Sequence, residues 1–262
     1  MTVARDDTEA HDESYFASFT DLLVGVLFVF IILLMVFAGN LNKQTERAKE
    51  ATEEARKATE AIIGMLESRN TVLQEMRRSL KEAGVTVTVD EEQGILRLPE
   101  SVLFDLGKDA LSVRGTDALA KLAGVMRRYL PCLARLRETE SGNAEICATL
   151  KLKNRDGLET VLIEGHTDSK GSDKGFDNWG LSARRSINVF RQLTQTESIL
   201  NQNIVNLQGY PVLAVSAYES RRPVNPNAAT DDELKQNRRI DLRFIMRSPT
   251  PEDVKRLQSV QQ

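Results

Sequence analysis

The feature that most constrains this chain is an apolar run near its N-terminus, from Ser18 to Ala38, in a sequence of which 28% is charged. No charged residue occurs between Leu22 and Ala38. Counted from Tyr15, the run is long enough for a tilted helix to cross ~30 Å of hydrocarbon at 1.5 Å per residue. It predicts a transmembrane helix at residues 15–40, with any larger domain following it.

One carboxylate, Asp21, lies within this apolar segment. A charged side chain at membrane depth is costly and is therefore a functional hypothesis by default. The alternative is that Asp21 marks the water-facing start of a shorter span. Its position alone leaves both interpretations open.

The residues that flank the run give conflicting signals about orientation. The N-terminal tail, residues 1–14, is acidic rather than basic, and no small-x-small cleavage site follows the run, so we interpret the run as an uncleaved anchor. The positive-inside rule, applied to Lys43, Arg47 and Lys49, would place the remainder of the chain in the cytoplasm. Acidic residues surround these three cations, and the ligand chemistry considered below favours the opposite orientation.

Residues 41–83 form a charged segment without proline, which predicts a helical linker. With Arg69 counted as a polar position, its apolar residues follow heptad spacing, which is typical of a coiled coil: Ile62, Leu66, Leu73, Met76, Leu80 and Ala83. A coiled-coil seam needs a partner to cover it, so this pattern favours pairing with a second copy of the chain. A solvated charged spacer is the alternative.

The hydrophobic period changes from helical to alternating at Gly84, which indicates a separate domain at residues 84–247 before a polar tail at 248–262. Strands and helices are mixed along it. This order predicts an α+β fold, with a compact α/β sandwich long enough to bury its own core. We expect strands at 85–89, 95–98, 158–164, 212–217 and 240–246, and helices at 109–130 and 181–195.

Charge and cysteine content set further limits. The formal net charge is −3, and no clustered basic face is evident, so we expect no nucleic-acid partner. The two cysteines, Cys132 and Cys147, both follow the apolar run. If their region lies outside the cytoplasm they can form a disulfide; two inert thiols are the alternative.

Several short motifs lie in a fixed order in the predicted domain. Leu103-Phe104-Asp105 comes first and Gly165-His166-Thr167-Asp168 follows a strand. Asn178-x-x-Leu181-Ser182-x-x-Arg185 opens a helix, and Asn237-Arg238-Arg239 precedes the last strand. Together they resemble the OmpA-like peptidoglycan-binding domain. The resemblance covers about residues 84–247 and implies a ligand with both an ammonium and carboxylates, the diaminopimelate-containing stem peptide of the cell wall.

The resemblance also implies roles for individual residues. Asp168 would pair with the ligand ammonium, and Arg185 would hold a ligand carboxylate through its planar guanidinium. The remaining contacts would come from Thr167, Asn178, Leu181 and Ser182, while Asn237 and Arg238 would brace the loop from behind. His166 has no partner His or Cys nearby and is expected to be structural, so we predict no metal site. We also expect no cofactor and no enzymatic activity. Asp177 stands where the family often has tyrosine, and the preceding loop is longer than usual.

A single span with an early aspartate, followed by such a domain, resembles the B subunits of ion-driven stator complexes. The run Phe19 to Ile32 is most similar to the B subunits of the Zorya antiphage defence system. This resemblance implies a homodimer inside a ring of a polytopic A-type (ZorA- or MotA-like) subunit in the bacterial inner membrane. The N-terminus would be cytoplasmic and the C-terminal domain periplasmic. Asp21 would carry a proton rather than sodium. A flagellar MotB- or PomB-type stator and a passive envelope tether are the alternatives.

Overall fold

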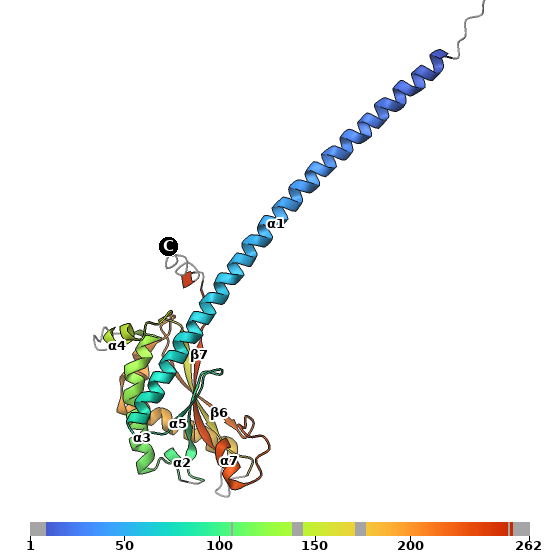
Figure 1. The fold of residues 1–262 in the computed structure, drawn as a ribbon. Helices are drawn as coiled ribbons and strands as arrows, with labels where there is room; N and C mark the ends of the chain where they lie inside the picture. Colours follow the sequence, from blue (N-terminus) through green and yellow to red (C-terminus); the bar gives the residue numbers. More distant parts are fainter. Residues whose placement is uncertain (1–8, 106, 138–143, 171–176, 251, 254–262) are drawn as a thin grey trace, which may run out of the picture. The chain divides into compact units, whose positions relative to one another are not determined.

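The computed structural model describes residues 9–105, 107–137, 144–170, 177–250 and 252–253, with side chains described from Ser18 onward. The first residues of the predicted N-terminal tail and the last nine of the C-terminal tail lie outside this part of the chain. The chain divides into two compact units, Met1–Lys57 and Ala58–Gln262. A single helix, α1 (Glu9–Glu82), supplies the described part of the first unit and the start of the second (Figure 1).

The first unit contains the predicted transmembrane segment. From Phe19 to Leu41, its large apolar side chains are 40–70% exposed, because the described residues contain nothing that covers them. A helix surface of this kind requires lipid or another protein around it. In the described chain this is the one helix that is long and apolar enough to cross a membrane.

The second unit is built on a five-stranded sheet with the order β1-β2-β7-β4-β6. Neighbouring strands are antiparallel except for β4 and β6, which run parallel. The bounds are β1 (Thr88–Asp90), β2 (Ile95–Pro99), β4 (Leu158–His166), β6 (Leu213–Glu219) and β7 (Arg239–Met246). A small second sheet pairs β3 (Arg135–Leu136) with β5 (Ile204–Val205).

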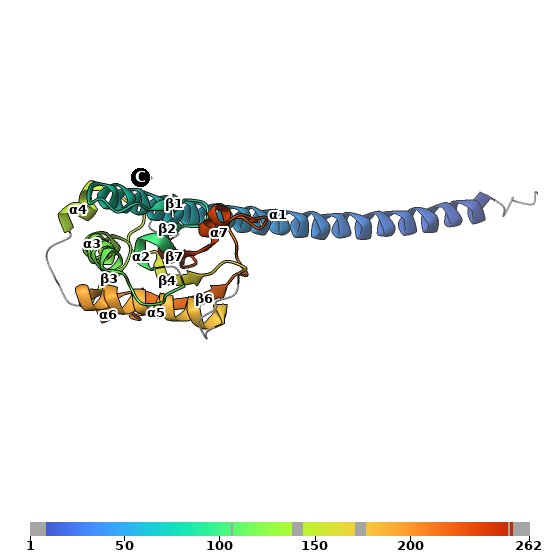
Figure 2. The same cartoon turned by 90° about the horizontal axis from the view of Figure 1, so that it is seen from below.

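Helices from distant parts of the sequence cover one face of this sheet. The C-terminal part of α1, α3 and α5 lie along that face (Figure 2). The bounds of the helices after α1 are α2 (Glu100–Leu103), α3 (Val113–Tyr129), η1 (Leu130–Cys132), α4 (Ala144–Thr149), α5 (Asn178–Thr196), α6 (Ile199–Gln202) and α7 (Asp231–Asn237). The α+β fold class predicted from the sequence is therefore confirmed.

Alternation along β7 separates the core from the opposite face of the sheet. Ile240, Leu242 and Phe244 are buried in the apolar core under the helices. Because successive side chains of a strand point to opposite faces, the intervening Asp241 and Arg243 face away from it. The opposite face is consequently lined by charged residues, which form a network described below.

Close contact between α5 and β4 depends on a glycine. A Cβ atom at Gly165 would lie 2.1 Å from the carbonyl oxygen of Ser182, far inside van der Waals contact. Only glycine allows the helix to approach the strand at this point. The glycine of the predicted Gly-His-Thr-Asp motif thus holds the start of α5 against the end of β4.

The C-terminal part of α1 packs into the second unit instead of standing apart as a linker. Leu73, Met76 and Leu80, three residues of the heptad seam, are fully buried in the chain's own core. Ile62 and Leu66, at the start of the seam, are 44% and 37% exposed. The seam predicted for pairing is therefore covered over its second half by the sheet and helices of the same chain, and the compact unit begins near Ala58 rather than at residue 84.

Three local features differ from the sequence-based expectations. The segment after β2, where no helix was predicted, contains α2. Helix α5 begins at Asn178 because the Asp177 carboxylate accepts a hydrogen bond from the Gly180 amide at 2.7 Å and caps the helix. No helix was predicted where α7 lies, although Thr230 and Glu233 form a capping box at its start.

The structure joins Cys132 and Cys147 in a disulfide, with a Cα–Cα distance of 5.1 Å. It links the end of η1 to α4, across a sequence separation of 15 residues. Residues 138–143 of that segment lie outside the described chain. Both cysteines belong to the apolar core.

Candidate ligand-binding site

Asp168 lies just beyond the end of β4 and is almost completely buried. One of its carboxylate oxygens accepts a hydrogen bond from the Lys170 amide at 3.0 Å. Its backbone carbonyl accepts a hydrogen bond from the Asn178 side chain at 3.1 Å. These bonds tie the residue to the start of α5, and they leave its second carboxylate oxygen for an ion pair with Arg238.

Arg185 lies on α5, two turns after its start, and is 1% exposed. Its Nε donates to the carbonyl of Lys108 at 3.0 Å, and its guanidinium lies 5.2 Å from the ring centre of Phe104. Its Nη2 pairs with the carboxylate of Glu100. The remaining group, Nη1, is buried without a hydrogen-bond partner among the described residues.

The two predicted ligand-binding residues are connected through two others. Arg238 pairs with Asp168 on one side and approaches Glu100 at 2.7 Å on the other. Glu100 in turn contacts Arg185. The result is a buried chain of alternating charges, Asp168–Arg238–Glu100–Arg185, which we call the site cluster. Asp168 and Arg185 do not contact each other directly among the ion pairs of the described chain.

The surroundings shift the pKa values of the two arginines in opposite directions. Burial lowers the pKa of Arg185, and the nearby Glu100 carboxylate only partly offsets this. Burial also acts to lower the pKa of Arg238, but the hydrogen bond that Arg238 donates to Asp168 and the charge of Glu100 outweigh it, so that this pKa is raised. Both groups stay charged at neutral pH, because the pKa of arginine starts above 12.

One edge of the site cluster borders a pocket of about 200 Å³. Glu100 and Arg238 line it, together with Ser101, Phe104, Asp231 and Lys235. Its wall therefore carries two cations, two carboxylates and an aromatic ring. Such a wall suits a small polar group that bears both signs of charge.

The other predicted residues lie nearby in different roles. Thr167 is buried, and its hydroxyl has no hydrogen-bond partner in the described chain. The Ser182 hydroxyl donates to the carbonyl of Trp179 at 3.0 Å and is therefore occupied within α5. Leu181 is buried at the start of the same helix. Asn237 makes two 2.9 Å hydrogen bonds to the backbone of Asn225 and so braces the loop before α7.

Glu100 is the member of the site cluster that sequence reasoning missed. It opens α2 directly after Pro99, and its amide donates to the carbonyl of Arg238 at 3.0 Å. A glutamate at the end of an apolar strand could have been noted, but its partners lie 85 and 138 positions away in the sequence. Arg238 was expected to brace a loop, whereas it contacts both carboxylates of the cluster.

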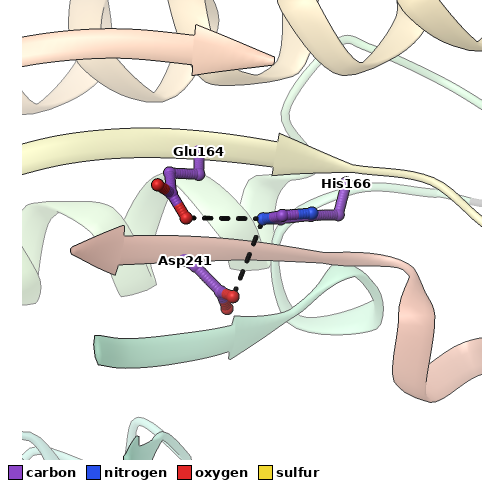
Figure 3. Close-up of side chains that lie close together, drawn as sticks. All are labelled: Glu164, His166 and Asp241. Atoms are coloured by element: carbon purple, nitrogen blue, oxygen red, sulfur yellow. Dashed lines mark ion pairs between the residues drawn. The ribbon is translucent and has the colours of Figure 1, made fainter. Parts of the chain in front are cut away.

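A second buried polar group lies on the opposite face of the sheet. His166 Nε2 lies 3.7 Å from a carboxylate oxygen of Glu164 and 3.7 Å from one of Asp241 (Figure 3). The imidazole stacks on the ring of Tyr218 at 5.4 Å. All three residues of the trio are 0–1% exposed. A histidine with two carboxylates is a donor set that could hold a cation.

The arginines around this trio argue against a cation there. Arg243 holds the Glu164 carboxylate through two bonds of 2.7 and 3.0 Å. Arg97 and Arg239 each donate to Asp241 at 2.9 Å. Three guanidinium charges thus surround two carboxylates, and a divalent ion would add to an excess of buried positive charge. We call this group the sheet network and assign it a structural role.

The protonation state of His166 follows from the same surroundings. Burial lowers its pKa, and the positive charge of Arg239 acts in the same direction. The carboxylates of Glu164 and Asp241 act against this shift without overcoming it. The imidazole is therefore neutral at pH 7, which suits a side chain that stacks on an aromatic ring inside the domain.

Comparison with known protein families gives a match over a part of the chain that includes Asp168, Arg185 and Arg238 of the site cluster, but not Glu100. Residues 134–238 match the OmpA family. Over these residues the chain is similar to the OmpA family. The matched residues include Thr167, Asp168, Asn178 and Arg185.

Individual proteins and solved structures resemble the chain at low sequence identity. An uncharacterised protein of Bacillus subtilis, YtxE, is 23% identical over 90% of both chains. A putative MotB-like protein from Desulfovibrio vulgaris is 24% identical, with a TM-score of 0.48, over 70% of this chain and 97% of the other. The periplasmic domain of Helicobacter pylori MotB is 21% identical, with a TM-score of 0.40, over 64% and 83%.

Proposed function

We propose that this chain anchors an inner-membrane complex to the cell wall, with its OmpA-like domain in the periplasm binding the peptidoglycan stem peptide. The observation that carries the proposal is the site cluster. It combines a buried carboxylate, Asp168, with a buried arginine, Arg185, whose Nη1 has no hydrogen-bond partner in the described part of the chain. The other two members of the cluster, Glu100 and Arg238, line a pocket of mixed charge. An ammonium and a carboxylate on one ligand would match these two groups.

The orientation follows from the ligand. Peptidoglycan lies outside the inner membrane, so the domain after the span would be periplasmic and the N-terminus cytoplasmic. The disulfide between Cys132 and Cys147 is consistent with this compartment, because disulfides persist in the oxidising periplasm. The exposed apolar surface of α1 from Phe19 to Leu41 would lie in the bilayer and against partner helices.

Sedimentation with purified peptidoglycan sacculi tests the wall-binding proposal. The full chain in detergent should co-sediment, and Asp168→Asn should remove at least nine-tenths of the bound protein, because a charged contact contributes about 1.5–3 kcal/mol. Asp117→Asn, which changes an exposed aspartate on α3, is the matched control and should bind normally. Equal binding by all three proteins would rule out this site.

We further propose that the complex is an ion-driven motor in which Asp21 carries a proton. Two copies of the chain would form a stationary axle inside a ring of a polytopic A-type subunit. A carboxylate in an otherwise uncharged span fits ion transfer, since protonation makes it neutral at membrane depth. The similarity of Phe19 to Ile32 to Zorya B subunits supports a role in antiphage defence. A flagellar-type stator and a passive tether are the competing functions.

The substitution Asp21→Asn separates the motor from the tether. It keeps the size of the side chain but cannot gain or lose a proton, so it should abolish the motor output while wall binding persists. Phage plating on cells with the complete operon, with swimming measured in parallel, shows which output is lost. Glu46→Gln, on the exposed surface of α1, is the control. Full protection and full motility in the Asp21 variant would leave only the tether.

A further inference from the structure

Glu100 is in an unusual position for a glutamate. It is 6% exposed, and both of its carboxylate oxygens face arginines: Oε1 contacts Arg185, and Oε2 lies 2.7 Å from Arg238. Its backbone is held by the hydrogen bond from its amide to the carbonyl of Arg238. The main chain is thus fixed while the carboxylate lies at the end of a flexible side chain.

The charges of the site cluster balance without a ligand. Arg185 and Arg238 supply two positive charges, and Glu100 and Asp168 supply two negative ones. A ligand carboxylate that approaches Arg185 therefore meets a guanidinium that is already paired through Nη2. Only Nη1 is without a partner in the described chain. A two-point contact with a carboxylate, the strongest that arginine makes, requires that Glu100 give up its bond.

The pocket gives Glu100 somewhere to move. Glu100 lines this space of about 200 Å³ together with Arg238 and Lys235. A glutamate that rotates away from Arg185 would remain near Arg238 on the pocket wall, so its charge would not be left isolated. The exchange would therefore replace one carboxylate by another on Arg185 without burying an unpaired charge.

We infer that Glu100 is an internal carboxylate that occupies Arg185 in the ligand-free protein, and that a carboxylate of the ligand takes its place. This inference rests on the proposed wall-binding function and adds a specificity-determining residue to it. A ligand with a free carboxylate can replace Glu100. A ligand whose carboxylate is amidated cannot make this exchange, so its affinity does not depend on Glu100, whereas the affinity for the free acid is lowered by competition with Glu100.

The test compares two soluble muropeptides, each a disaccharide with a tripeptide that ends in meso-diaminopimelate. One has the free diaminopimelate carboxylates and the other is amidated. Affinities are measured by calorimetry with the full chain in detergent. Glu100→Gln should bind the free acid roughly five- to tenfold more tightly than the wild type, because a charged competitor has been removed from Arg185. It should bind the amidated ligand within about twofold of wild type.

Two more variants complete the design. Glu92→Gln changes an exposed glutamate in the turn between β1 and β2 and should bind like the wild type. Glu100→Asp keeps the charge but is one methylene shorter, so it cannot reach both arginines and should also bind the free acid more tightly. If Glu100→Gln does not fold, as judged by its thermal unfolding, Glu100→Asp provides the answer.

The outcomes separate the two proposals. Folded Glu100 variants that bind the free acid no more tightly than wild type would overturn the inference while leaving wall binding intact. A wild-type protein that binds neither muropeptide would contradict the proposed function. If the wild type binds neither muropeptide but Glu100→Gln binds the free acid, the inference about Glu100 is supported. If Glu100→Gln also binds neither muropeptide, the inference is overturned together with the proposed function.

Discussion

The site cluster and the sheet network are built from the same kinds of residue but differ in what surrounds them. Both are buried groups of arginines and carboxylates. In the sheet network the side chains come from β2, β4 and β7, and every carboxylate has at least one well-aligned guanidinium. In the site cluster, Glu100, Asp168 and Arg238 lie beyond strand ends and Arg185 lies on α5. The cluster borders a pocket, and Nη1 of Arg185 has no hydrogen-bond partner among the described residues. The two groups therefore share burial and charge, but only the site cluster borders a pocket that a ligand could enter.

The same comparison explains why the motif residues Gly165 to Asp168 divide into two roles. His166 is still within β4, so its side chain lies on the charged face of the sheet. Asp168 comes two residues after the strand ends, where the chain turns toward α5. This short motif thus contributes His166 to the sheet network and Asp168 to the site cluster. Of the two, only Asp168 is linked to the pocket, through its ion pair with Arg238.

The largest expected effect is in the sheet network. Asp241→Asn should lower the free energy of unfolding by about 3–5 kcal/mol, because it leaves Arg97 and Arg239 buried without their shared carboxylate. Urea unfolding of the fragment 58–262, which contains the compact unit with its own core, measures this. A loss below about 1 kcal/mol would show that the sheet network contributes no more to stability than a surface ion pair.

The disulfide provides a reference that touches neither charged group. Replacing both Cys132 and Cys147 by alanine should lower the free energy of unfolding by about 3 kcal/mol, the chain-entropy value for a loop of about this length. Peptidoglycan binding by the folded variant should be unchanged in the sedimentation assay. Reduced binding at a temperature well below its unfolding transition would mean that the bridge also shapes the site.

A substitution in the site cluster should affect ligand binding more than stability. Asp168→Asn should cost only about 1–2 kcal/mol of stability, since Asn keeps the size and one acceptor toward the Lys170 amide. Wall binding, in contrast, should be lost. Urea unfolding and sedimentation of the same preparation give both values. A stability loss as large as that of Asp241→Asn would erase the distinction between the two groups.

The smallest effect concerns the pH dependence of the sheet network. The pKa of His166 is lowered in the folded protein, mainly by burial, so above pH ~6.5 the neutral form is favoured in both states. As pH falls below this value, the unfolded chain takes up a proton that the folded chain resists, and stability decreases by at most about 1.4 kcal/mol per pH unit. His166→Gln should flatten the slope of unfolding free energy between pH 6.5 and 5. An unchanged slope would assign the pH dependence to other groups.

Local sequence patterns determined much of the architecture. The apolar run to Ala38, the change of period at Gly84 and the alternation along Ile240–Met246 each reflect short-range geometry, and each corresponds to an element of the structure. The order of the motifs predicted the OmpA-like domain, and residues 134–238 match that family. The start of α7 was missed although Thr230 and Glu233 carry a complete capping box, so here the local signal was present and overlooked.

Tertiary structure decided what covers each apolar face and which charges meet. The period of α1 shows that Leu73, Met76 and Leu80 share a face, but it is equally compatible with a second helix and with the chain's own sheet. The alternation of β7 likewise cannot show which strand lies beside it. Glu100 meets Arg185 and Arg238 only because β2 pairs with β7 and α5 packs on β4. Ion pairs between residues so far apart depend on topology, and short-range periodicity carries no information about it.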